Sequence, residues 1–254
     1  ARYADFFIVM AVTDPSVSAY KGMSMFIVPA GTPGLRILRN VGMADEPAAT
    51  HAYLEFDQVR LRPDQMLGAP GEAFVVAQVR LGGGRVHHAM RTIGLAQKAL
   101  DALCERALSR HTQGSLLADK QMVQEKIADS WLELEQFRLL VMRTAWRIDK
   151  YQDYQKVRKD IAAVKAAMPK VLHDIAARAL HVHGSIGAST EMPFAGMISR
   201  AFQMGLADGP TEVHKITVAR QLLRDYAPSD TRFPAYHRPT AAAAAQRKFS
   251  AVLG

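Results

Sequence analysis

The stretch MGLADGPTEVH, residues 204–214, joins an apolar approach, one carboxylate, a Gly-Pro break and the start of a helix. Pro210 suits the first turn of a helix, because a missing backbone N–H costs nothing there. After it, a helical spacing recurs at Val213, Ile216, Thr217, Leu222 and Leu223. These residues leave two interpretations of Asp208 open: a helix-capping carboxylate in a loop, or a catalytic base that faces a pocket.

Apolar residues follow a helical period in three longer stretches, residues 85–109, 123–148 and 157–179. Pro169 predicts a kink in the third stretch. With the helix after Pro210, these stretches make four amphipathic helices joined by short loops. They predict an up-and-down four-helix bundle.

The glycine run Gly82-Gly83-Gly84 interrupts the first helical pattern. It predicts a flexible joint between a short helix and a long one, because glycine accepts many backbone conformations. The alternative is the close backbone approach of a ligand whose charge is recognised by Arg85.

The first 66 residues have the character of β-strands, with apolar or alternating segments at residues 6–12, 22–28, 35–38 and 52–56. Four strands make a thin sheet, so we expect residues 1–66 to be the remainder of a β-domain whose first strands lie elsewhere. The expected fold class is α+β and mostly α: a partial antiparallel β-domain, then the helical bundle in residues 67–226. A peripheral tail, residues 227–254, is expected to hold a short helix near residues 241–249.

Composition excludes several classes of protein. The 254 residues include one cysteine, Cys104, so an internal disulfide is impossible and a reducing, cytosolic setting is expected. The net charge of +8 is concentrated partly in the tail, and aromatic residues do not interleave with it, which disfavours nucleic-acid binding. No apolar run reaches the length of a membrane span.

Three further motifs each have a structural and a functional interpretation. The adjacent residues His87 and His88 diverge by about 100° on a helix, and no Cys cluster or HExxH motif supports them, so no metal site is predicted. The segment HVHGSIGA, residues 181–188, suits a helix end that needs glycine or a nest that binds phosphate. The segment RHTQGS, residues 110–115, suits a solvated connector or a phosphate-binding loop.

Taken in this order and at these distances, the motifs resemble the C-terminal two-thirds of a flavin-dependent acyl-CoA dehydrogenase. The matching segments are GMSMFIVPAGTPG (22–34), FDQVRLRP (56–63), GLAQKAL (94–100), RHTQG (110–114), HVHGSIGASTEMP (181–193) and residues 208–222, which end in TVARQL. The resemblance is strongest to the subgroup of family members ten and eleven, through the signature Asp-Gly-Pro-x-Glu-Val-His. The family's N-terminal helical domain and first β-strands have no counterpart in this sequence, so we expect either a fragment or a chain whose partner piece is another polypeptide.

The resemblance implies FAD as cofactor. The loop residues Arg110, Thr112 and Gln113 match the loop that reaches the FAD pyrophosphate across a dimer interface. Other matching positions on the cofactor side are Gln121, His181, Gly184, Ser185, Thr211 and Glu212. His181 and Ser185 depart from the family's usual Gln-x-x-Gly-Gly, so the contact at this helix end is expected to be altered.

The resemblance also implies a catalytic role for Asp208, which falls where most members have a glutamate base. Arg85, His88 and Gly209 match positions on the substrate side. An aspartate withdraws its carboxylate by about 1.3–1.5 Å, one C–C bond, relative to glutamate. We therefore expect a branched, hydroxylated or otherwise unusual acyl group.

The implied activity is the α,β-dehydrogenation of an acyl-CoA thioester, an oxidoreductase reaction on a CH–CH group that belongs to fatty acid β-oxidation. The implied partners are the acyl-CoA substrate, further copies in a homodimer or homotetramer, and an electron-transferring flavoprotein. The implied location is the bacterial cytoplasm or an organelle matrix. The alternative is a non-catalytic structural subunit or fragment that pairs with a catalytic partner.

Overall fold

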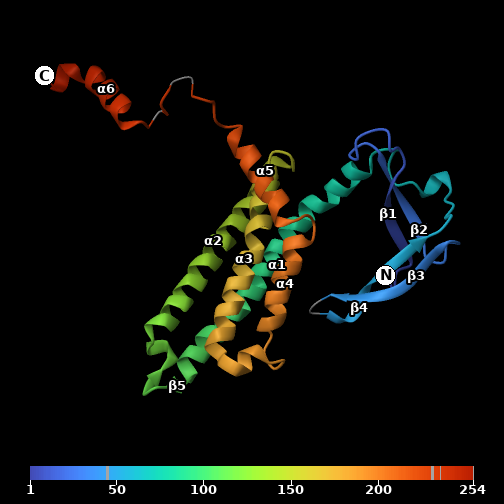
Figure 1. Ribbon diagram of the computed structural model, residues 1–254, viewed down its shortest axis with the longest axis horizontal. Helices are drawn as coiled ribbons and strands as arrows, with labels where there is room; N and C mark the ends of the chain where they lie inside the picture. The colour runs from blue at the N-terminus through green and yellow to red at the C-terminus, as the bar shows by residue number, and fades with distance from the viewer. Residues whose placement is uncertain (44–45, 230–231, 235, 254) are drawn as a thin grey trace.

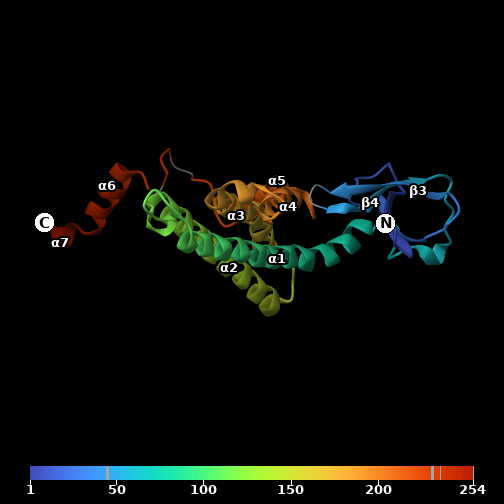
Figure 2. The same ribbon diagram turned by 90° about the horizontal axis from the view of Figure 1, so that it is seen from below.

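The computed structural model describes residues 1–43, 46–229, 232–234 and 236–253. Helices form an elongated bundle, with the strands beyond one end of α1 and the C-terminal tail beyond the opposite end of the molecule (Figure 1). Figure 2 shows α1 running along the bundle and out toward the strands. The α+β, mostly α fold class is confirmed.

All four predicted strands are present, and they pair as two separate antiparallel ladders. Strand β1 (Phe6–Val12) pairs with β2 (Met23–Pro29), and β3 (Leu35–Met43) pairs with β4 (Glu46–Phe56). The two later strands are longer than the sequence indicated. Gly34, at φ +89°, lies where the chain enters β3, and a Cβ there would stand 2.0 Å from the Asp57 carbonyl oxygen. Such thin sheets leave apolar residues of β1 exposed, among them Phe6, Ile8 and Val12.

Three predicted helices of the bundle are present as α1 (Ala73–Ser109), α2 (Gln121–Tyr151) and α3 (Arg158–His183). The predicted helix after Pro210 is α5 (Thr211–Leu223), and a further helix, α4 (Phe194–Leu206), precedes it. The sequence analysis missed α4, in which Gly196 and Gly205 weaken the helical signal. Helix α3 packs against α1, α2, α4 and α5. Pro169 lies within α3.

The predicted joint at the glycine run is wrong, because α1 continues through it without a break. A Cβ at Gly82 would lie 3.1 Å from the Tyr154 ring, and one at Gly84 would lie 3.4 Å from Asp208 Oδ2. Close packing on the glycine face therefore holds a helix that local propensity disfavours.

The remaining short elements connect or flank the bundle. The hairpin of β5 (His111–Thr112) and β6 (Ser115–Leu116) links α1 to α2, and a 3-10 helix spans Gly184–Ala188 after α3. The tail holds α6 (Arg238–Lys248), in the region where a short helix was expected, and α7 (Ser250–Leu253).

The core is built almost entirely by the bundle. One cluster lies toward the C-terminal end of α1, and its buried residues include Leu103, Leu134, Leu172, Ile175 and Phe194. The second lies around the middle of α3, and its buried residues include Val86, Phe137, Val141, Val164 and Met168. Both clusters draw on the apolar stripes that the sequence displays.

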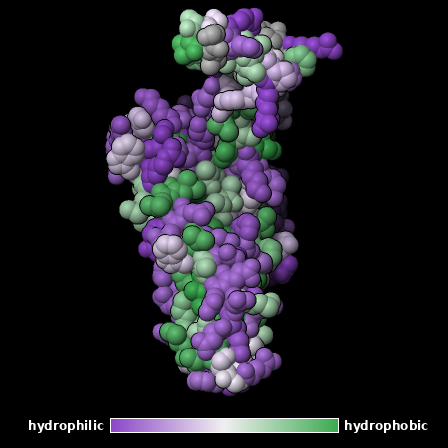
Figure 3. Space-filling view, turned by 90° about the vertical axis from the view of Figure 1, so that its left-hand side faces the viewer, coloured by the Kyte–Doolittle hydropathy of each residue, from purple (hydrophilic) through white to green (hydrophobic). Residues whose placement is uncertain are grey.

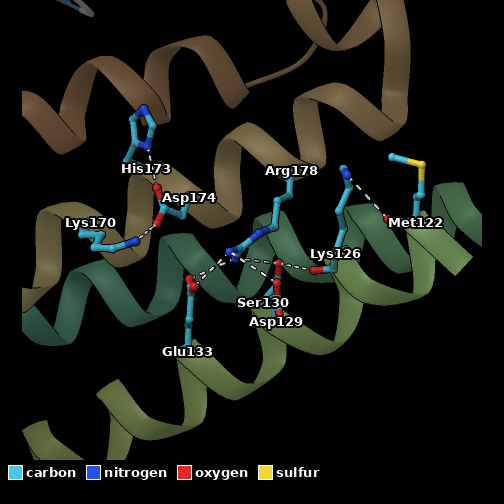
Figure 4. A network of polar contacts seen from close by, with 9 residues as sticks. All are labelled: Met122, Lys126, Asp129, Ser130, Glu133, Lys170, His173, Asp174 and Arg178. Atoms are coloured by element: carbon cyan, nitrogen blue, oxygen red, sulfur yellow. Dashed lines mark hydrogen bonds and ion pairs between the residues drawn. The ribbon is translucent and has the colours of Figure 1, made fainter.

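A polar clamp joins α2 to α3 at the edge of this core (Figure 4). Both outer nitrogens of the Arg178 guanidinium donate to the Glu133 carboxylate at 2.9 Å, a bidentate pair with fixed geometry. On the same helix, Lys170 and His173 both contact the Asp174 carboxylate. The Arg178–Glu133 pair links the two helices, whereas the contacts of Asp174 lie within α3.

The outer face of the bundle is not uniformly polar. On the side seen in Figure 3, apolar side chains interrupt a largely hydrophilic surface. Large side chains of α2 that lie more than half exposed in this chain include Trp131, Leu139, Met142 and Trp146.

Two leucines of α2 test this assignment of the core. Leu134 is fully buried and Leu132 is 47% exposed. We expect Leu134→Ala to lower the free energy of unfolding by about 2–5 kcal/mol, because it leaves a cavity. The control Leu132→Ala changes it by about 0.5 kcal/mol or less. Equal losses in denaturant unfolding would contradict the packing described.

Candidate active site

The break between α4 and α5 places Asp208 at a turn inside the bundle. Asp208 has φ +56° and Gly209 has φ +106°, both in the left-handed region that non-glycine residues rarely adopt. The sequence placed Pro210 in the first turn of the helix, but it is the N-cap of α5, one position earlier. No side chain caps this helix. The capping interpretation of Asp208 therefore fails.

The Asp208 carboxylate contacts α1 instead. Its Oδ2 lies 3.2 Å from His88 Nε2, and the two side chains are 19% and 22% exposed. Burial lowers the pKa of His88, and the negative charge of Asp208 opposes part of that shift. The neutral imidazole is thereby favoured, with its Nε2–H facing the carboxylate. His88 Nδ1 is buried and has no hydrogen-bond partner among the described residues.

The carbonyl group of Asp208 is held from two other directions. Arg85 Nε donates to it from α1 at 3.1 Å, and His214 Nε2 donates to it from α5 at 3.2 Å. Arg85 also donates to Gln78 Oε1. His214 is buried, and burial lowers its pKa. The residue that carries the carboxylate is thus fixed through its backbone.

Lys165 of α3 also contacts the backbone of this turn. The sequence analysis missed this residue. Its Nζ donates to the carbonyl oxygen of Met204 at 2.6 Å and to that of Gly209 at 3.2 Å. The side chain is fully buried, and burial lowers its pKa. A signal was present, because Lys165 follows Ile161 by four residues and so lies on the apolar face of its helix.

Seven residues predicted to bind the cofactor lie far from this turn. Arg110 caps the C-terminus of α1, Thr112 belongs to β5, and Gln121 begins α2. Gln113 has φ +49°, and a Cβ at Gly184 would meet nothing within 4 Å. His181 and Ser185 flank that glycine, and the side chains of both are exposed.

These residues gather at one end of the bundle, where Figure 1 shows β5 and the α3–α4 connection. Gly84 lies beside Asp208, and α1 continues from it to Arg110. At about 1.5 Å per residue, this part of the helix separates the two places by roughly 40 Å. The structure thus brings together Arg85, His88, Asp208 and Gly209, and keeps the loop at Arg110 apart from them.

Comparison with known proteins identifies the family of this chain. A family model described as the C-terminal domain of acyl-CoA dehydrogenase matches residues 71–223, which is more than half of the chain. The chain belongs to the acyl-CoA dehydrogenase family.

Relatives extend the likeness to the strands. Acyl-CoA dehydrogenase family member 11 of Gallus gallus is 41% identical over 86% of this chain and 28% of the relative. The (R)-benzylsuccinyl-CoA dehydrogenase of Thauera aromatica is 36% identical over 87% of this chain and 53% of the relative. A solved structure from Mycobacterium abscessus, described as that of an acyl-CoA dehydrogenase, is 39% identical to this chain. Its TM-score is 0.82, over 88% of this chain and 55% of that one. The chain therefore spans about half or less of the relatives it matches.

In this member of the family, a groove of about 560 Å³ lies beside the turn. Thr211 and Glu212 line it together with Phe202 and His173, whose rings meet edge to face. The Thr211 hydroxyl donates its hydrogen to the Gly205 carbonyl. Its oxygen is therefore left to accept a hydrogen bond from a ligand.

Other kinds of site find no support in the described part of this family member. Within residues 1–43, 46–229, 232–234 and 236–253, no three His, Cys, Asp or Glu side chains gather as metal ligands. Nor does any helix there combine the length and apolar character needed to cross a bilayer.

Two glycines test the geometry of the turn. A Cβ at Gly209 would lie 3.0 Å from His214 Nε2, at a φ that alanine avoids. Gly209→Ala is expected to lower the free energy of unfolding by about 1–3 kcal/mol. Gly205→Ala, whose Cβ would meet Thr211 Oγ1 at 3.5 Å, should be neutral or stabilise by up to about 1 kcal/mol. Thermal unfolding of both variants measures these changes. An unchanged free energy of unfolding in Gly209→Ala would contradict the strained turn.

Proposed function

We propose that this protein catalyses the α,β-dehydrogenation of an acyl-CoA thioester, with Asp208 as the base. The observation that carries the proposal is the Asp208 carboxylate, which is turned away from the start of α5 and lies 3.2 Å from His88. Family membership supports the reaction class and FAD as cofactor. The acyl-CoA substrate and an electron-transferring flavoprotein as electron acceptor follow from the same membership.

The chemistry explains why a fixed, half-buried carboxylate is needed. The Cα–H of a thioester is a poor acid, so its proton is removed by a base held in place, while donors polarise the thioester carbonyl. Asp208 takes the proton from Cα, the β-hydrogen leaves with its bonding pair, and a Cα=Cβ double bond results. Bound FAD supplies the hydride-accepting chemistry that this reaction requires.

Residues around Asp208 divide the remaining work. His88, expected on the substrate side, contacts the carboxylate and so orients it toward the space beside α1. Arg85 holds the Asp208 carbonyl and brings a positive charge next to the place where the thioester would lie. Gly209 leaves the backbone after the base free of a side chain. We propose that Arg85 and Gly209 contact the substrate.

The residues present fit FAD at two places. Thr211 and Glu212 line the groove beside Asp208, where they would contact the cofactor of the same copy. Arg110, Thr112 and Gln113 form an exposed loop with two left-handed residues, Gln113 and Gly114, and they would hold the pyrophosphate with Gln121. His181, Gly184 and Ser185 offer the open helix end beyond α3.

The separation of these two places favours a homodimer. Roughly 40 Å of α1 lies between them, which is longer than one dinucleotide. We therefore propose that the loop at Arg110 serves the cofactor of a second copy related by two-fold symmetry.

A branched or otherwise unusual acyl group fits the immediate surroundings of the base. Gly84 faces Asp208 Oδ2, so the α1 wall carries no side chain at this position. One relative bears the name of a dehydrogenase for the bulky benzylsuccinyl thioester. The shorter carboxylate of aspartate and the recessed wall both favour a substrate with a substituent near its reacting carbons.

The base assignment is tested with the longest natural chain that carries this sequence, loaded with FAD. Asp208→Asn removes the proton acceptor and should slow acyl-CoA-dependent bleaching of the flavin absorbance by about 10²–10⁴-fold. The control Asp225→Asn, an exposed carboxylate paired with Lys159, should bleach at the wild-type rate. Full activity of Asp208→Asn would refute the role, and no bleaching by the wild type would support the non-catalytic alternative.

The shared cofactor site is tested by complementation. Arg110→Ala alone should lower the FAD content of the purified protein, because a pyrophosphate contact is lost. Co-expressed with Asp208→Asn, it forms hybrid dimers in which one site contains both defects and the other is intact. Random pairing should restore about a quarter of wild-type activity. Unchanged FAD content in Arg110→Ala, or no recovery in the mixture, would contradict the proposal.

A further inference from the structure

A fully buried lysine lies in the middle of the central helix of the bundle. Lys165 of α3 is 0% exposed and is flanked on its face by core residues such as Ile161 and Met168. No carboxylate of the described residues lies within ion-pair distance of its ammonium group. Burying an ammonium is costly unless its hydrogens are donated to good acceptors.

The acceptors of Lys165 are the two carbonyl groups that enclose Asp208. Met204 lies four residues before Asp208 and Gly209 directly after it, at 2.6 and 3.2 Å from Nζ. Met204 belongs to the last turn of α4, where carbonyl groups lack helical donors and a positive charge is favoured. One side chain thus ties the end of α4 to the residue beyond the break.

Other contacts of the turn come from α1 and α5, and the Thr211 hydroxyl also bridges the break by donating to the Gly205 carbonyl. Arg85 and His214 both donate to the Asp208 carbonyl oxygen. Lys165, unlike Arg85 and His214, holds backbone carbonyl groups on both sides of Asp208. Its contacts therefore oppose relaxation of Asp208 from φ +56° toward ordinary backbone.

We propose that Lys165 is a positioning residue for the base, which fixes the Asp208 carboxylate by clamping the carbonyl groups of Met204 and Gly209. The inference rests on the proposed function of Asp208 and adds a residue that touches neither substrate nor cofactor. Loss of the clamp should displace the carboxylate by a fraction of an ångström to an ångström, which slows proton abstraction more than it weakens substrate binding.

The test compares Lys165→Met with Ile161→Ala in the longest natural chain that carries this sequence, loaded with FAD. Methionine keeps the buried stem without donors, and Ile161→Ala destabilises the same helix one turn away without removing a hydrogen-bond donor from the turn. Per bound flavin, Lys165→Met should lower the limiting rate of flavin reduction by about 100-fold, with little change in half-saturating acyl-CoA. Ile161→Ala should stay within a few-fold of the wild type.

Two readouts separate positioning from a structural defect. Deuterium at Cα of the substrate should slow Lys165→Met more than the wild type, because proton abstraction then limits the rate. Amide hydrogens of peptides covering residues 204–210 should exchange faster in Lys165→Met than in Ile161→Ala, with or without FAD. An unchanged isotope effect together with unchanged exchange would overturn the proposal, as would an equally slow Ile161→Ala.

A second variant covers the case in which Lys165→Met does not fold. Lys165→Gln keeps a shorter neutral donor, and the loss of one carbonyl contact should lower the rate about tenfold. A wild-type rate per bound flavin would overturn the proposal. Asp208→Asn is measured alongside: if it retains full rate, the base assignment fails, while exchange at residues 204–210 still reports independently whether Lys165 clamps the turn.

Discussion

The burial of unpaired carbonyl groups at the break between α4 and α5 is the constraint on which this structure depends. A helix that ends against other helices leaves its last carbonyl groups without helical donors and only partly open to water. Here Lys165 and Thr211 supply donors to Met204 and Gly205, and Arg85 and His214 supply them to Asp208. Polar side chains from three helices must therefore enter an apolar core at one level, and that level carries the carboxylate.

The same constraint explains the glycines of α1. Because the turn projects toward α1, its carboxylate needs a wall without side chains, and Gly84 provides one. On the roughly opposite side of the helix, Gly82 lets the Tyr154 ring pack against the backbone. Each glycine weakens the helix by roughly 1 kcal/mol relative to alanine, and tertiary packing offsets that loss. A rigid α1 also fixes the distance between Asp208 and the loop at Arg110.

Short apolar or alternating runs predicted the four strands. Helical periodicity predicted α1, α2, α3 and α5, because their apolar stripes are local in sequence. It missed α4, whose glycines hide a strong apolar face, and it placed a joint at Gly82 because the Tyr154 contact joins residues far apart in sequence. The Asp-Gly-Pro stretch drew attention to Asp208, whereas Lys165 went unnoticed. Its partners lie 39 and 44 residues away, and a lysine in an apolar stripe has no local signature of its role. The assignments around Arg110 come from family resemblance and stay predictions.

The backbone at position 208 bears on why the proposed base is an aspartate. At φ +56° a β-branched side chain is strained, and aspartate is enriched several-fold in this region. The left-handed turn therefore accommodates the short carboxylate. The short carboxylate reaches only as far as α1, where His88 and the Gly84 wall meet it. Under the proposed function, the reacting carbons approach close to α1, so the residues of that helix, as much as Asp208, would define which acyl groups fit.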